Sequence, residues 1–195
     1  MRIYNEENDK KEKESPNIFV EKLLKSRTIF ISGEINQAMA EKVSSQLLIL
    51  QDISDDPITI FINSQGGHVE SGDTIHDMIK FVKPKVRVVG TGWVASAAIT
   101  VFLAANKEDR FSLPNTRYMI HQPLGGFRGQ ATDVGIEAEE ILRVRKRINS
   151  IISNATGQPI EKVNKDTDRN YWLSAEDAIN YGIVNKIITS QDELN

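Results

Sequence analysis

The sequence predicts an α/β fold in which strands and helices alternate along the chain. Apolar stretches such as "RTIFIS", "PITIFIN" and "KVRVVGTG" have the length and β-branched content of buried strands. The segments between them carry apolar residues at every third or fourth position, which is the period of an amphipathic helix. Strands separated by helices pair in parallel through right-handed crossovers, so we expect a layered core with its helices outside. Functional residues are then expected where the strands end.

The first two helices of this pattern are predicted from their apolar stripes. Residues 36–52 begin with Asn36 as the expected cap and place four apolar side chains on one face: Met39, Val43, Leu47 and Leu50. The segment "VESGDTIHDMIKFV" does the same with a second set: Ile75, Met78, Ile79 and Val82. Trp93 and Val94, after the third strand, are expected to pack into the core.

The second half of the chain predicts a fourth strand, "TRYMIH", and a long helix over residues 133–156 that ends at Gly157. Pattern alone allows two interpretations of this charged helix: a solvated outer helix, or a helix that packs partly against another subunit. A shorter helix follows, with Ser174 and Asp177 spaced as a capping box and Gly182 as its end, before a last strand "IVNKII".

Composition limits the function classes. The 195 residues suit one domain over residues 17–195, preceded by a charged arm at 1–16 that we expect to be mobile. The net charge of −3 gives no basic face for nucleic acid, and no stretch predicts a signal peptide or membrane span, so we expect a cytoplasmic protein. The absence of cysteine excludes disulfides, thiolate metal sites and cysteine nucleophiles. No metal or organic cofactor is implied.

Residues suited to hydrolysis follow three of the predicted strands. Gly66 and Gly67 end the second strand, where glycine serves either a tight turn or an anion-binding backbone. Ser96 enters a helix N-terminus, as a small core residue or as a nucleophile. His121 ends an apolar strand, where a general base would stand, although a structural histidine bonded to a carbonyl would look the same. Their joint occurrence favours a catalytic site.

The other two histidines, His68 and His76, lie in or beside a charged helix. We expect both of them to be exposed to solvent. His121 is therefore the candidate base.

These residues lie within motifs that resemble the caseinolytic (Clp) protease proteolytic subunit family from about Ile18 onward. The matching stretches are "INSQGGHVESGDTIHDMI", "VASAA" with "FLAA", "LPNTRYMIHQPLGG", "GQATD", "ATGQP" and "DTDRNYWLSAEDAINYGIV". The resemblance implies a crotonase-like fold of repeated β/α units with the long helix as a protruding handle. It implies two stacked heptameric rings, homomeric or mixed with a paralogue, which cut unfolded polypeptides supplied by an AAA+ unfoldase that consumes the ATP.

By the same resemblance, Ser96 is the nucleophile and His121 the base, with the backbone amides of Gly67 and Ala97 as the oxyanion hole. The position of the family's third triad residue, an aspartate, is held by Asn170. An asparagine oxygen can orient the imidazole, but it stabilises the imidazolium poorly because it is neutral. The preceding pair, Asp168 and Arg169, is similar to the family's inter-ring contact.

Three functional hypotheses follow. The first is a serine endopeptidase with a Ser-His-Asn triad, weakly active alone. The second is a catalytically silent structural or regulatory ring subunit that pairs with an active paralogue. The third is the acyl-CoA chemistry of crotonase relatives, which would not need the Ser96 and His121 pair.

Overall fold

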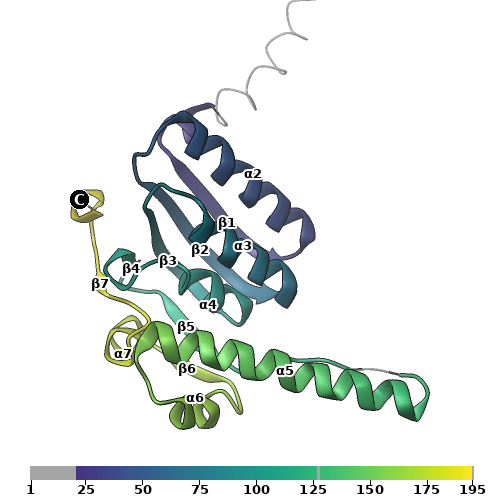
Figure 1. The fold of residues 1–195 in the computed structure, drawn as a ribbon. Coiled ribbons are helices and arrows are strands. Elements are labelled where there is room, and N and C mark those ends of the chain that lie inside the picture. Colours follow the sequence, from purple (N-terminus) through teal and green to yellow (C-terminus); the bar gives the residue numbers. More distant parts are fainter. Residues whose placement is uncertain (1–20, 127, 195) are drawn as a thin grey trace, which may run out of the picture.

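One mixed sheet runs through the described residues, 21–126 and 128–194, of the computed structural model (Figure 1). Its parallel path has the order β1 (Thr28–Ile35), β2 (Ile58–Gly67), β3 (Val86–Ala95), β4 (Arg110–Ser112) and β7 (Lys186–Ile187). The far end of β3 pairs in parallel with β5 (Arg117–Ile120), which pairs antiparallel with β6 (Tyr171–Leu173). The α/β fold expected from the sequence is confirmed, and the predicted arm at 1–16 lies outside the described residues.

Six helices are described, and three of them pack side by side: α2 (Gln37–Ile53), α3 (Val69–Phe81) and α4 (Ala97–Phe102) (Figure 1). The remaining three are α5 (Ala131–Thr156), α6 (Ile160–Asp166) and α7 (Ala175–Tyr181), and two short 3-10 turns cover Lys107–Asp109 and Gln191–Leu194. Figure 1 shows the N-terminal part of α5 projecting away from the sheet. This is the long helix that the sequence predicts, begun two residues earlier.

The first helix forms as its sequence predicts. The side chain of Asn36 caps α2 by accepting a hydrogen bond from the amide of Met39 at 2.9 Å. Val43, Leu47 and Leu50 are fully buried against the sheet, where each contributes about 2 kcal/mol by leaving water. Local capping and tertiary burial therefore favour the same segment.

The two predicted helix ends at glycine are also confirmed. Gly157 ends α5 and Gly182 ends α7, both in the left-handed conformation, with φ of 78° and 93°. The capping box is present, because the hydroxyl of Ser174 accepts from the amide of Asp177 while the carboxylate of Asp177 accepts from the amide of Ser174. The two glycines differ in how closely other atoms surround their Cα positions.

Alanine at these two glycines separates backbone strain from steric overlap. We expect Gly157→Ala to lower the free energy of unfolding by about 1 kcal/mol, since a methyl group there would meet nothing within 4 Å. We expect Gly182→Ala to cost about 2 kcal/mol more, because its methyl would lie 2.4 Å from the carbonyl oxygen of Thr156. Urea unfolding of both variants measures the difference, and equal midpoints would contradict this account.

Four sequence-based expectations differ from the structure. β4 and β6 were not predicted, because three-residue strands are too short to show a period, and β6 makes the sheet mixed. The last strand is only two residues long.

His76, expected in solvent, is buried at 7% exposure because α4 covers that face of α3. Trp93, expected in the core, is 40% exposed and stacks on Trp172, while Val94 is buried as expected.

Candidate active site

Ser96 occupies a strained turn between β3 and α4. Its φ of 57° and ψ of −126° lie outside the common regions, and in the described residues Arg27 is the only other non-glycine residue with positive φ. The strain is held by two backbone hydrogen bonds: the Ser96 amide donates to the carbonyl of Met119 at 3.0 Å, and its own carbonyl accepts from the amide of Ile99 at 2.9 Å. Strain stored in this way is typical of functional sites.

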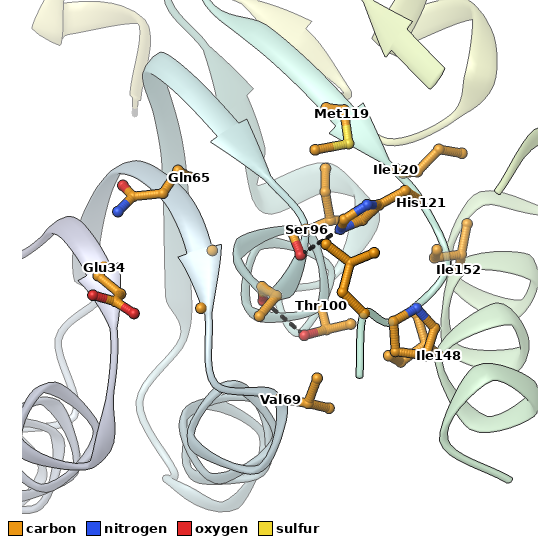
Figure 2. Close-up of a pocket in the computed structure, with 16 residues that line it drawn as sticks. Glu34, Gln65, Val69, Ser96, Thr100, Met119, Ile120, His121, Ile148 and Ile152 are labelled. Carbon is orange, nitrogen blue, oxygen red and sulfur yellow. Dashed lines mark hydrogen bonds between the residues drawn. The ribbon is translucent and has the colours of Figure 1, made fainter. Parts of the chain in front are cut away.

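The imidazole of His121 points toward the hydroxyl of Ser96, as Figure 2 shows. The distance between Nε2 of His121 and Oγ of Ser96 is 2.7 Å, which is hydrogen-bonding distance. The pairing of Ala95 with Met119 explains the contact, because it brings the end of β3 beside the end of β5. The imidazole is therefore placed to accept the serine proton.

Asn170 is brought to the other side of the imidazole by β6. The antiparallel pairing of Ile120 with Tyr171 places the residue after β5, His121, opposite the residue before β6, Asn170. Gln122 fixes the segment further, since its amide donates to the carbonyl of Thr167 at 2.6 Å and its Nε2 donates to the carbonyl of Asp168 at 2.7 Å. The structure thus brings together the three side chains that the sequence singled out.

The protonation of His121 follows from these surroundings. Burial lowers the pKa of His121 from its ordinary value of 6.5, because an imidazolium is poorly solvated in the cleft. A side-chain hydrogen bond with Asn170 acts in the opposite direction. That sign is expected where an amide oxygen accepts the Nδ1 proton. The net result is a neutral imidazole at pH 7, which is the form that a general base requires.

Gly66 and Gly67 are glycines because the backbone packs closely at this point. A methyl group on Gly66 would lie 2.6 Å from Cβ of Ser96 and 2.8 Å from the amide nitrogen of Ala97. A methyl group on Gly67, with φ of 149°, would lie 2.3 Å from the carbonyl oxygen of Ile35. Close approach to the serine turn at Gly66 and to β1 at Gly67, and not only chain reversal, therefore requires glycine here.

These residues border a cleft of about 300 Å³. Apolar side chains from several elements form part of its lining: Val69, Ile99, Leu124, Ile148 and Ile152. Figure 2 shows Glu34 and Gln65 at the opposite side of the cleft from Ile148 and Ile152 of α5. Sequence reasoning missed Ile148 and Ile152 as lining residues, since helix periodicity identifies them only as core positions.

The acidic residues near Asn170 are engaged elsewhere. The carboxylate of Asp166 accepts from the hydroxyl of Tyr181 at 2.9 Å and pairs with Lys162. Oδ1 of Asp168 lies 3.2 Å from Nη2 of Arg145 in α5. Oδ2 of Asp168 lies 4.0 Å from Nε of Arg169, whose side chain is almost fully exposed. Neither carboxylate is free to replace the missing triad aspartate without losing these contacts.

Comparison with known proteins identifies the family. The model of the Clp protease family matches residues 10–191 of the chain. The chain belongs to the Clp protease family. ATP-dependent Clp protease proteolytic subunit 3 of Rhizobium etli is 56% identical over 191 residues, covering 97% of this chain and 98% of that protein. Proteolytic subunit 2 of Pseudomonas aeruginosa is 51% identical over 175 residues, covering 90% and 87%.

Solved structures confirm the Clp protease fold. ClpP1 from Listeria monocytogenes matches with a TM-score of 0.83 and 64% sequence identity, covering 91% of this chain and 99% of that one. An asparagine-to-aspartate mutant of the same Listeria protein matches with a TM-score of 0.86 at the same identity and coverage. The crotonase-like, Clp-type α/β fold expected from the sequence is therefore correct.

Two kinds of feature are absent from the described residues, 21–126 and 128–194. None of their helices combines the length and the apolar character needed to cross a membrane. Within the same ranges, no group of three or more histidine, aspartate or glutamate side chains is arranged to hold a metal ion.

Proposed function

We propose that this Clp protease subunit is a serine endopeptidase in which Ser96 attacks the peptide carbonyl. His121 takes the serine proton through Nε2 and returns it to the leaving amine. Asn170 orients the imidazole through its Nδ1 proton. The amides of Gly67 and Ala97 donate to the oxyanion that forms on the carbonyl oxygen. No metal or cofactor takes part in this scheme.

The 2.7 Å contact between Ser96 and His121, made at a strained turn, is the observation that carries this proposal. A structural serine does not require positive φ or an imidazole within hydrogen-bonding distance. The apolar cleft beside it suits a polypeptide side chain. Membership of the Clp protease family supports peptide hydrolysis over acyl-CoA chemistry.

Replacing Ser96 tests the proposal. We expect wild type to cleave a short fluorogenic peptide slowly, and Ser96→Ala to reduce the rate to that of buffer, because the nucleophile is removed. The control is Ser45→Ala, an exposed serine of α2 remote from the cleft. Cleavage that Ser96→Ala leaves unchanged would refute the serine mechanism.

A second candidate function is a structural or regulatory ring subunit that activates a paralogue. The neutral Asn170 favours it, since an uncharged partner leaves the imidazolium without a compensating charge. Mixing the Ser96→Ala subunit with an active paralogue distinguishes the two functions. Full peptidase activity of the mixed assembly supports the regulatory subunit. A loss of activity in proportion to the share of Ser96→Ala subunit supports the serine endopeptidase.

We further propose the assembly of the family for this chain: two stacked heptameric rings in the cytoplasm, fed with unfolded polypeptides by an ATP-driven AAA+ unfoldase. The length of α5 beyond the sheet supports a handle that packs against the opposite ring. Asp168 and Arg169 are exposed beside Arg145 of α5, which supports an ion-pair contact between the rings.

A further inference from the structure

A second cavity, of about 550 Å³, lies at the C-terminal end of α4. Its walls come from the end of α3, the segment that follows α4, and the end of α5. The N-terminal end of the same short helix borders the cleft that holds Ser96. The volume is in the range of small-molecule sites, and the proposed mechanism makes no use of it.

Among the described residues that line this cavity, the charged ones are all cationic: Lys80, Lys107 and Arg110. Arg110 is buried at 4% exposure and is fixed by donating to the carbonyls of Ala105 and Ala155, both at 2.8 Å. Both lysines are exposed. This charge distribution favours a ligand with a carboxylate.

His76 supplies a polar group inside the same cavity. Its Nδ1 lies 2.7 Å from the carbonyl oxygen of Thr100 in α4, and because a carbonyl can only accept, Nδ1 carries the proton. In the neutral ring Nε2 is then an acceptor, and it has no hydrogen-bond partner among residues 21–126 and 128–194. A ligand that donates an N-H to Nε2 would satisfy it.

The remaining lining combines apolar residues, Leu103, Ala105, Ile151 and Ala155, with three polar ones, Asn106, Asn154 and Thr156. A ligand that fits must therefore combine a carboxylate, an N-H donor and a small aliphatic group. The C-terminal residue of a short peptide has all three when its side chain is aliphatic. Peptide hydrolysis after an aliphatic residue leaves such an end on one product, so the proposal rests on the proposed function only for the source of the ligand.

We propose that this cavity, the α3–α4–α5 pocket, binds the free carboxyl end of a short peptide whose last residue is aliphatic. Lys80 and Lys107 bind the carboxylate, Nε2 of His76 accepts from the amide N-H, and the aliphatic side chain packs on Leu103 and Ile151. A ligand bound to His76 would then be coupled to α4, because Nδ1 of His76 is hydrogen-bonded to the carbonyl of Thr100 in that helix.

N-acetyl-leucine is the probe, titrated into the full chain by calorimetry and by NMR of the imidazole nitrogens. The chain has three histidines, so the signals of His76 can be assigned from a His76→Gln spectrum. We expect the Nε2 signal of His76 to shift on binding. N-acetyl-leucinamide, which lacks the carboxylate, and 4-methylpentanoate, which lacks the N-H, should each bind at least about tenfold more weakly.

The double variant Lys80→Gln with Lys107→Gln should weaken binding of N-acetyl-leucine by more than about tenfold. Lys83→Gln, an exposed lysine near the end of α3 but outside the cavity lining, is the matched control and should bind within about twofold of wild type. Absence of binding at millimolar probe, equal binding by the double variant, or an unmoved His76 signal would overturn the site. Equal binding of 4-methylpentanoate would overturn the role of His76. Because the readout is binding, none of these results depends on whether Ser96 cleaves peptides.

Discussion

Asn170→Asp is expected to raise peptide turnover by up to about 10⁴-fold, the loss that follows when the aspartate of a serine triad is replaced by asparagine. The sheet pairing that places residue 170 opposite His121 does not depend on its side chain, so aspartate should enter the same position. Its negative charge would stabilise the imidazolium that forms as Ser96 attacks. Steady-state cleavage of a fluorogenic peptide measures the gain.

The same substitution should change the pH profile. In wild type the pKa of His121 is below 6.5, so the acid limb of kcat/KM is expected below pH 6.5, where the base becomes protonated. A carboxylate at position 170 favours the imidazolium and should move that limb upward by about one pH unit or more. Asn180→Asp adds an equal charge on the exposed surface of α7 and should change neither quantity. A faster Asn170→Asp enzyme with an unmoved acid limb would contradict an electrostatic role.

Gly66→Ala is expected to abolish cleavage. The added methyl would overlap Cβ of Ser96 at 2.6 Å and the amide nitrogen of Ala97 at 2.8 Å, so the serine turn must shift. Displacement of a nucleophile by about 1 Å costs on the order of 10² in rate, and loss of one oxyanion donor costs about 10² to 10³. Assaying the variant in the Asn170→Asp background makes the loss measurable over a wide range.

The matched control for this loss is Gly33→Ala in β1. Gly33 also has a positive φ, 81°, but a methyl group there would meet nothing within 4 Å. It should therefore lose some stability through backbone strain and keep its activity. If Gly66→Ala retained wild-type activity with a folded structure, the close packing of Gly66 on Ser96 would not matter for catalysis.

The parts of the fold that the sequence predicts are those with a local physical cause. The apolar stripe and Asn36 cap of α2, the capping box of α7 and the glycine ends of α5 and α7 are all present as expected. Burial that depends on a distant partner was not predictable. His76 is covered by α4, and Trp93 stacks on Trp172, a residue 79 positions later that no periodicity relates to it.

The residues of the candidate site also differ in whether the sequence predicts them. Ser96 and His121 were identified from their places after apolar strands, and the structure confirms that those strands are neighbours. Asn170 was identified only through family resemblance, because the short strand that places it opposite His121 has no pattern of its own. The apolar lining from Ile148 and Ile152 was missed because these residues satisfy the helix period equally well as core.

Labelling by a fluorophosphonate probe tests most directly whether Ser96 is an activated nucleophile. Peptide mapping by mass spectrometry should find the label on Ser96 in wild type, more rapidly in Asn170→Asp, and nowhere in Ser96→Ala. His121→Ala should label far more slowly, because the hydroxyl loses its base. An unlabelled Ser96 in both wild type and Asn170→Asp would contradict the proposed peptidase and leave the silent ring subunit as the function of this chain.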